Sequence, residues 1–309
     1  MKKLLAILLP ISLFLVSCGG GEGDLQPIEP INTTYINHPD SVLTYVPDTK
    51  FEEKLVALGL DYVLDDFVLT QNIIDLEEIN LNNLGIKDLT GIENFVDLTI
   101  LHCSYNQLSS LDISNNTALA YLYCYDNQLT SLDVSNNADL YLLNCNSNQL
   151  TSLDVSNNTL LAWLDFIGNN ITSLDLSNNT ALSYLSCRFN QLTNLDVSNN
   201  TALTELQCGM NQITSLDISN NSALTRLGCE ANQLTSLDVS NNSAITLLNC
   251  SYNQLTSLNL RNGNNTNMSP ISSNNNQLYC IEVDNVNYAN LNFIYVPSQS
   301  YFLEDCGVK

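Results

Sequence analysis

The same phrase returns every 21 residues through the middle of this chain. From residue 101 to residue 258 variants of the pattern L-x-C-x-x-N-Q-L-T-S-L-D-V-S-N-N-x-A-L occur eight times with no change in spacing. The cysteine ladder is Cys103, Cys124, Cys145, Cys187, Cys208, Cys229 and Cys250, and Phe166 takes that place in the remaining repeat. The leading leucines are Leu101, Leu122, Leu143, Leu164, Leu185, Leu206, Leu227 and Leu248. A fixed period of roughly 20 to 50 residues is typical of a solenoid, in which each repeat buries its apolar side against its neighbours. Such chains usually expose an extended binding surface and seldom a catalytic pocket.

The repeat itself predicts a parallel β-sheet. Side chains alternate along a strand, so Leu122 and Cys124 should face inward while Tyr121, Tyr123 and Tyr125 face outward. A coil of this length leaves only about ten residues for the return path, too few for a regular helix with two turns. We therefore expect a curved sheet with 21-residue coils, and extended or 3₁₀ segments on the convex side.

The phrase Leu119-x-x-Leu122-x-Cys124-x-x-Asn127-x-Leu129 resembles the consensus of leucine-rich repeats, with cysteine in place of one leucine. The resemblance extends over residues 79–283. More narrowly, residues 46–52, 89–93 and 280–284 resemble leucine-rich-repeat lipoproteins of Flavobacterium-type Bacteroidetes. Internalins are a more distant resemblance. These similarities imply a parallel-stranded horseshoe or arc with a role in surface contact, and they do not identify a ligand.

The N-terminus has the features of an export signal. Two lysines precede an apolar run from Leu4 to Val16 that is too short to span a bilayer comfortably. The tetrad at residues 15–18 resembles a bacterial lipobox, which implies cleavage before Cys18 and lipid on its thiol. An ordinary secretory signal is the alternative. The resemblance implies a lipid-anchored protein of the outer membrane at the surface of a Gram-negative cell.

Composition changes divide the rest of the chain. We assign residues 1–17 to the signal peptide, 18–45 to a lipidated tether, 46–78 to an N-terminal cap, 79–283 to the solenoid and 284–309 to a C-terminal cap. The cap should contain a helix at 48–58, because Thr49 to Glu52 fits a capping box and Phe51, Leu55 and Leu58 share a helical face. Terminal caps cover the apolar ends that a solenoid would otherwise expose.

Charge and cysteine content restrict the partners. The net charge is −23, and a nucleic-acid surface needs clustered basic residues that this chain lacks. We expect no nucleic-acid partner, membrane contact through the lipid alone, and a monomer. The ladder cysteines take positions where the consensus has leucine, so we predict buried free thiols and no metal site. Cys280 and Cys306 lie outside the ladder, and we predict that they form a disulfide.

One aspartate per coil forms a second ladder: Asp112, Asp133, Asp154, Asp175, Asp196, Asp217 and Asp238. Each should accept backbone N–H bonds from the Ser-Asn-Asn segment that follows it. Calcium bridging between neighbouring carboxylates is the alternative, although the glycine-rich calcium nonapeptide is absent. We predict no resident cofactor and no enzymatic activity, because no nucleophile–histidine pair, zinc motif or phosphate loop is present.

The coils differ from one another at the outward strand positions, where aromatic residues gather in the N-terminal half. An exposed aromatic patch with polar surroundings indicates contact with a protein or a sugar, whereas stacking that only stabilises the sheet is the alternative. The candidate ligand-binding residues on the concave face are Tyr121, Tyr123, Tyr125, Trp163, Asp165, Tyr184 and Arg188.

Two functions follow from this pattern. The first is recognition or adhesion by a cell-surface lipoprotein whose concave face binds a protein or a polysaccharide. The second is a structural spacer or assembly scaffold in the cell envelope without a specific ligand on that face. The aromatic residues favour the first.

Overall fold

The computed structural model describes residues 42–269, 271–274 and 276–307. The predicted signal peptide, Cys18 and most of the predicted tether lie outside the described residues. The description below concerns the compact unit that begins at Val42.

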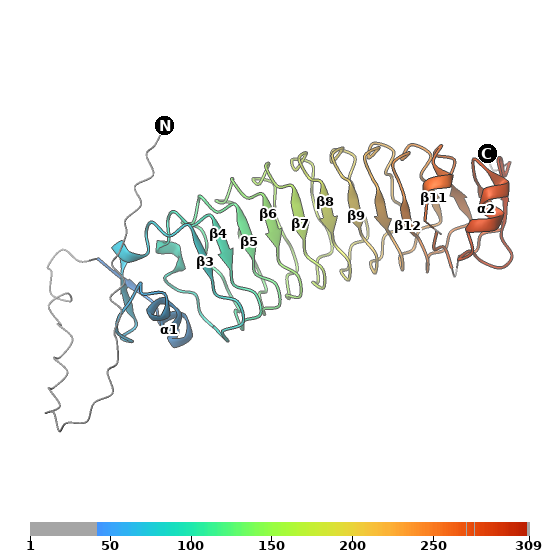
Figure 1. Cartoon of the computed structure of the whole chain (residues 1–309). Helices are drawn as coiled ribbons and strands as arrows, with labels where there is room; N and C mark the ends of the chain where they lie inside the picture. The colour runs from blue at the N-terminus through green and yellow to red at the C-terminus, as the bar shows by residue number, and fades with distance from the viewer. Residues whose placement is uncertain (1–41, 270, 275, 308–309) are drawn as a thin grey trace, which may run out of the picture. The chain divides into compact units, whose positions relative to one another are not determined.

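The unit is built on a nine-stranded parallel sheet in which each coil adds one strand (Figure 1). Its strands are three residues long: β3 Glu78–Asn80, β4 Ile100–His102, β5 Tyr121–Tyr123, β6 Leu142–Asn144, β7 Trp163–Asp165, β8 Tyr184–Ser186, β9 Glu205–Gln207, β10 Arg226–Gly228 and β12 Leu247–Asn249. Ser272 and Tyr295 continue the ladder as single parallel bridges. Nine strands and two bridges give eleven successive rungs, and the predicted solenoid with 21-residue coils is confirmed.

The register explains why the spacing cannot slip. Leu122 pairs with Leu101 and Leu143, and its side chain is fully buried, as are those of its counterparts from Leu101 to Leu227. Shifting one coil by a residue would turn its leucine and cysteine to solvent and its polar residues inward. Burial of one leucine in each coil therefore holds the outward residues in straight rows.

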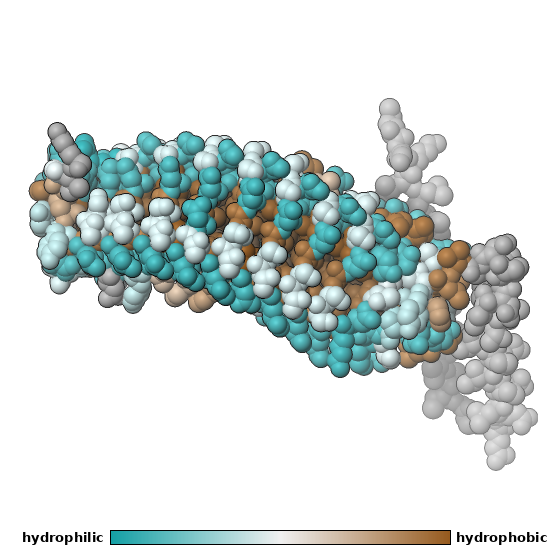
Figure 2. Space-filling view, turned by 180° about the vertical axis from the view of Figure 1, so that it is seen from behind, coloured by the Kyte–Doolittle hydropathy of each residue, from teal (hydrophilic) through white to brown (hydrophobic). Residues whose placement is uncertain are grey.

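The other side of the coils is extended for most of its length, as predicted. A four-stranded parallel sheet forms there only at the C-terminal end, from β11 Ser236–Asp238, β13 Ser257–Asn259, β14 Cys280–Glu282 and β15 Tyr301–Leu303. Short 3₁₀ helices are η2 Thr70–Asn72, η3 Ile92–Asn94 and η4 Asn265–Asn267. Viewed from behind, hydrophobic side chains run along the coils in a band between hydrophilic rows (Figure 2).

The N-terminal cap contains a helix, but its start differs from the expectation. Helix α1 spans Thr49–Ala57, and Asp48 is its N-cap, accepting hydrogen bonds from the N–H groups of Lys50 and Phe51. The predicted capping box does not form, because Glu52 is buried and accepts from the N–H groups of Asp65 and Asp66. Glu52 therefore fastens the following loop instead of the helix end.

Two further differences appear in the cap. Leu58, predicted to share the buried face, ends the helix and is 47% exposed. Strand β1 Leu43–Tyr45, in a stretch assigned to the tether, pairs antiparallel with β2 Phe67–Leu69. Asp48 also accepts from the N–H groups of Lys87 and Asp88 (2.7 and 3.2 Å), so one carboxylate joins the cap to the first repeat.

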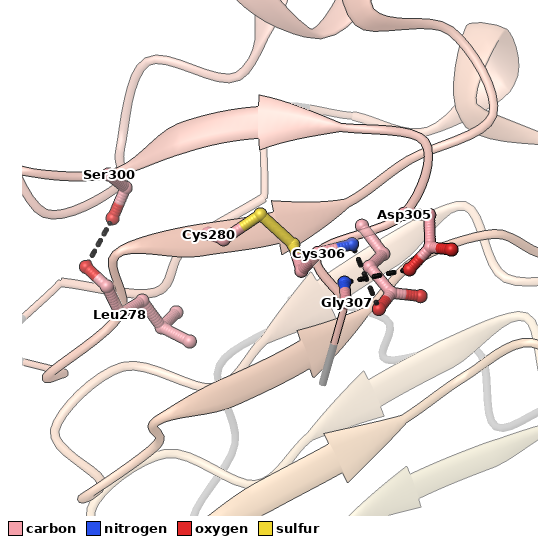
Figure 3. Close-up of a disulfide and its surroundings, with 7 residues drawn as sticks. Leu278, Cys280, Ser300, Asp305, Cys306 and Gly307 are labelled. Atoms are coloured by element: carbon pink, nitrogen blue, oxygen red, sulfur yellow. Dashed lines mark hydrogen bonds between the residues drawn. A yellow bond between two sulfur atoms is a disulfide. The ribbon is translucent and has the colours of Figure 1, made fainter. Parts of the chain in front are cut away.

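The C-terminal cap is a helix and a last strand held by a disulfide. Helix α2 spans Val286–Asn292, and β15 pairs with β14. Cys280 on β14 is bonded to Cys306, with a Cα–Cα distance of 5.9 Å (Figure 3). Ser300 donates to the carbonyl of Leu278, which ties the two chain segments together on the other side of the bridge (Figure 3).

One ladder of asparagines closes the turn after each main-sheet strand from β4 to β12: Asn106, Asn127, Asn148, Asn169, Asn190, Asn211, Asn232 and Asn253. The Nδ2 of Asn127 donates to the carbonyls of Cys103 and Cys124 (3.0 and 3.1 Å), and its Oδ1 accepts from the N–H of Leu108 (3.0 Å). The residue before each ladder asparagine has positive φ, a left-handed conformation that only glycine adopts without cost. These residues are Tyr105, Asp126, Ser147, Gly168, Phe189, Met210, Ala231 and Tyr252. The buried amide therefore stabilises a turn that the backbone alone disfavours.

A second asparagine ladder was not predicted. The last residue of each Ser-Asn-Asn segment is fully buried: Asn116, Asn137, Asn158, Asn179, Asn200, Asn221 and Asn242. Asn137 is typical, since its Nδ2 donates to the carbonyls of Ile113 and Asn116 in the preceding coil (3.1 and 2.8 Å). The sequence predicts only a turn in this segment, whereas the final asparagine amide also hydrogen-bonds to the preceding coil.

The cysteine ladder is a buried row of free thiols, as predicted. Burial raises the pKa of the thiols of Cys103, Cys208 and Cys250 to about 12. These cysteines remain protonated at neutral pH, and a protonated thiol is a poor nucleophile and a poor metal ligand.

The aspartate ladder forms the predicted turns. Each carboxylate accepts from the N–H of the serine two residues later, over 2.8 to 3.0 Å. Hydrogen bonds from the N–H and hydroxyl of Ser156 lower the pKa of Asp154, and the same contacts act on its neighbours. A local partner therefore favours each charged form, even though like charges stack along the coils.

Replacing an inward leucine should cost far more than replacing the outward residue beside it. Leu164 is fully buried, so Leu164→Ala should lower the free energy of unfolding by about 2–5 kcal/mol through cavity formation. Trp163 is 38% exposed and stacks on one neighbour, so Trp163→Ala should cost about 1 kcal/mol. Urea denaturation of both variants measures the difference. Equal losses would mean that the outward aromatic residue belongs to the core.

Removing the disulfide should loosen the C-terminal cap. Cys306→Ser opens a bridge with a sequence separation of 26, and we expect a loss of about 3 kcal/mol. Hydrogen exchange should become faster in α2 and β15 and remain unchanged in β5 to β8. Cys280→Ser should reproduce the effect and the double variant should add nothing to it. Unchanged exchange in α2 would contradict the stabilising role of the bridge.

Candidate binding surface on the main sheet

The outward side chains of the nine-stranded sheet form a surface that we call the sheet face. The strand register places them in three rows along the solenoid. The first row is Ile100, Tyr121, Leu142, Trp163, Tyr184, Glu205, Arg226 and Leu247. The second row is His102, Tyr123, Asn144, Asp165, Ser186, Gln207, Gly228 and Asn249. The third row, just beyond the strands, is Ser104, Tyr125, Asn146, Ile167, Arg188, Gly209, Glu230 and Ser251.

The predicted tyrosines of β5 pack against neighbouring rings. Tyr123 stacks on His102 with ring centroids 4.7 Å apart, and Tyr125 meets Tyr105 edge to face at 4.9 Å. Tyr121 contacts Tyr141 at 5.8 Å. All three predicted tyrosines are partly buried. The three ring pairs join the coil of β5 to the coils on either side of it, and they reach the surface of the sheet.

A second aromatic group lies two coils away. Trp163 and Tyr184 stack with centroids 3.7 Å apart and planes 10° apart. The coil of β6 separates them from the tyrosines and presents Leu142, Asn144 and Asn146. The predicted residues therefore form two aromatic groups with a mainly polar coil between them.

Asp165 lies beside the second group and is almost completely buried. It pairs in register with Asn144 on one side and Ser186 on the other, and only 7% of its surface is exposed. Burial raises the pKa of its carboxyl. Its Oδ1 and the Oγ of Ser186 make no hydrogen bond of normal geometry among the described residues, but the side chains of Asn146 and Ser186 and the N–H of Ile167 lie close enough to oppose this rise in the pKa. Burial also raises the pKa of Tyr184, and the negative charge of Asp165 contributes in the same direction.

Arg188 contacts a residue that the sequence analysis did not select. Its Nη2 donates to Oε1 of Glu230, two coils away, and Glu230 is only 6% exposed. Gly209 lies between them, and a Cβ atom there would come within 2.6 Å of the Glu230 carboxylate. The ion pair therefore spans the coil of β9, and the outward position of that coil must be a glycine.

A second glycine makes room for a neighbouring amide in the same way. A Cβ atom on Gly228 would lie 2.2 Å from Oε1 of Gln207. The sequence contained a signal for both contacts, because Gly209 and Gly228 stand at outward strand positions where the other coils carry side chains. The sequence analysis selected aromatic residues and therefore missed this polar cluster of Gln207 and Glu230.

The sheet face carries both signs of charge. Arg226 Nη1 lies 3.6 Å from Glu205 Oε2, and His102 Nε2 lies 3.5 Å from Glu78 Oε1. Among the described residues, no group of three or more histidine, cysteine, aspartate or glutamate side chains is arranged to hold a metal ion. None of the described helices is both long enough and apolar enough to cross a membrane.

The other side of the solenoid contains a groove of about 270 Å³ next to the aspartate ladder. Asp217, Asp238 and the hydroxyls of four serines line it, together with Leu216 and Asn241. Both aspartates already accept hydrogen bonds from serine N–H groups. Seven of its eight lining residues are polar, and none of the predicted binding residues lies in it.

Comparison with known proteins identifies the fold. No protein-family model matches the chain. Over 73 residues it is 42% identical to internalin J of Listeria monocytogenes serotype 4b (strain F2365), a match that covers 24% of this chain and 8% of internalin J. The solved functional domain of internalin J from Listeria monocytogenes, which includes a cysteine ladder, is 33% identical with a TM-score of 0.66. That similarity covers 85% of this chain and 61% of the internalin J domain.

A more distant similarity involves a receptor with a bound partner. The leucine-rich-repeat ectodomain of the plant receptor kinase GASSHO1/SCHENGEN3 from Arabidopsis thaliana was solved in complex with CASPARIAN STRIP INTEGRITY FACTOR 2. It is 21% identical with a TM-score of 0.60, covering 74% of this chain and 32% of that ectodomain. The present chain thus spans less than two thirds of each of these proteins. Its 21-residue coils, parallel sheet and cysteine ladder give it the internalin-like leucine-rich-repeat fold.

Proposed function

We propose that this chain is a non-enzymatic recognition or adhesion lipoprotein that binds a protein partner through the sheet face. The observation that carries the proposal is the contrast between the core and the sheet face. Inward positions repeat one leucine and one small thiol per coil, whereas the three outward rows change from coil to coil and include aromatic, acidic and basic groups. Core packing places little demand on outward residues, so variation concentrated there is typical of a recognition surface.

The energetic features of the sheet face support binding. Buried charged groups are costly unless they are paired and fully hydrogen-bonded. Asp165 and Glu230 are both buried at this surface, and each has an oxygen without a partner among the described residues. The stacked pairs Trp163–Tyr184 and His102–Tyr123 lie on the same face. A fold that served only as a spacer would gain nothing from keeping such groups at one surface.

We place the protein at the outer membrane, attached by lipid on Cys18. The basis is the lipobox-like sequence that ends in Cys18.

The anchor can be tested by a single substitution. Cys18→Ser removes the thiol that would receive the lipid, so the protein should move from the detergent phase to the aqueous phase on phase separation, and labelling with radioactive palmitate should disappear. Cys250→Ser serves as the control, because it removes a buried thiol elsewhere and should leave partitioning unchanged. Unaltered detergent partitioning of Cys18→Ser would rule out the lipid anchor.

Recognition through the sheet face can be tested by site-specific photo-crosslinking in cells. A photoreactive phenylalanine at Trp163 or Tyr123 should give discrete protein adducts, because these positions would lie against the partner. The matched control is Leu160, which is exposed in the same coil as Trp163 but lies outside the three rows. Adducts at Leu160 alone, or none at any position, would favour the spacer. Heterogeneous adducts that glycosidases remove would favour a polysaccharide.

A further inference from the structure

Buried polar atoms without a protein partner occur both inside the solenoid and on the sheet face. Among the described residues, seven are the Oδ1 atoms of the second asparagine ladder, and four belong to sheet-face side chains on the coils of β7 to β10: Asp165 Oδ1, Ser186 Oγ, Arg188 Nε and Glu230 Oε2. Buried polar groups are normally hydrogen-bonded, and each exception needs an explanation. A group of exceptions at an outward surface is explained if a ligand supplies the missing contacts.

Asp165 differs from Glu230 in that no arginine or lysine among the described residues forms an ion pair with it. Glu230 is neutralised by Arg188, and Arg226 lies nearest to Glu205. None of the ion pairs among the described residues includes Asp165, although it is 93% buried. The carboxylate is thus held at a cost of desolvation that no charge on the sheet face offsets.

The surroundings of Asp165 favour a positively charged group. Tyr184 lies close enough for the charge of Asp165 to act on its hydroxyl, and Trp163 stacks on its ring. Aromatic rings attract cations as well as apolar groups. An aspartate beside a tryptophan and a tyrosine therefore offers both a counter-charge and a hydrocarbon wall to an extended basic side chain.

Access to the carboxylate distinguishes a side chain from a sugar. Sugars bind aromatic residues through the flat face of the ring, and here the facing surfaces of Trp163 and Tyr184 are already in contact at 3.7 Å. With 7% of its surface exposed, Asp165 is accessible to a narrow, flexible chain more readily than to a pyranose ring. A neutral hydroxyl would also leave the charge of the carboxylate uncompensated.

We propose that Asp165 is the specificity-determining contact for a lysine or arginine side chain of the protein partner, with Trp163 and Tyr184 packing along its stem. The inference rests on the proposed function of the sheet face. The strongly acidic net charge of −23 would attract a basic partner from a distance, and Asp165 would select where its basic side chain binds.

The only tryptophan of the chain lies in this site and reports binding directly. The full chain is titrated at constant ionic strength with acetyl-Gly-Gly-Arg-Gly-Gly-amide while the fluorescence of Trp163 is recorded. The lysine peptide and the citrulline peptide, a neutral isostere of arginine, are titrated in parallel, and so is maltohexaose as a neutral oligosaccharide. We expect a saturable change with the arginine and lysine peptides and none with citrulline or maltohexaose.

Two variants test the assignment to Asp165. Asp165→Asn should weaken arginine-peptide binding about tenfold or more, because a charge-assisted contact becomes a neutral one. Asp154→Asn removes the same charge from the exposed ladder and should leave binding unchanged. Asn144→Lys places an ammonium group next to Asp165 in the second row, and we expect it to abolish peptide binding while raising the melting temperature. Circular dichroism verifies that each variant is folded.

Equal binding of the citrulline peptide, or unchanged binding by Asp165→Asn, would overturn the proposal. A response to maltohexaose that Asp165→Asn abolishes would also overturn it and assign the site to a glycan. Failure here is distinguishable from failure of the proposed function. Protein adducts from a photoreactive group at Trp163, without any response to basic peptides, would leave recognition by the sheet face standing and remove only the role of Asp165.

Discussion

The hydrogen bonds of the asparagine at each strand exit are the interaction on which the rest of the structure depends. Asn127 donates to carbonyls of its own coil and of the preceding coil, and it accepts an N–H from the preceding coil. One side chain therefore fixes the turn and the distance to the next turn together. Because this contact recurs with the 21-residue period, the leucines fall into register and the outward residues form rows. The sheet face is a consequence of that turn.

Because the buried residues repeat in every coil, the outward residues can vary without disturbing the core. Each coil contributes the same inward leucine, so an outward change such as glycine for a larger residue leaves the core intact. The Arg188–Glu230 pair shows the result, because it spans a coil whose outward position is Gly209. Contacts of this kind join residues two repeats apart and so depend on the order of the coils, even though the backbone of each coil is nearly the same.

The repeat period was sufficient to predict the fold, because inward and outward positions follow from alternation along a short strand. Local and long-range details were harder to predict. Thr49 and Glu52 fit a capping box, but Asp48 caps the helix because Glu52 is needed by a loop that only the folded cap brings near. The site was predicted in part, because aromatic residues are conspicuous in a sequence. Gly209 indicated a missing side chain on the face, but the partner of Arg188 lies two coils away and depends on rotamers, so the sequence did not identify Glu230.

The cysteine ladder has a consequence for how this chain withstands oxidation. Nine cysteines follow Cys18 in the sequence, and in the unfolded chain any two of them could pair. Thiol–disulfide exchange requires a thiolate that is within reach of its target. Folding withdraws seven thiols into an apolar row where the charged form is suppressed, and it leaves Cys280 and Cys306 next to each other near the surface. Folding of the solenoid therefore protects the seven buried thiols from oxidation and leaves only Cys280 and Cys306 able to pair. This selectivity is lost when the coils unfold.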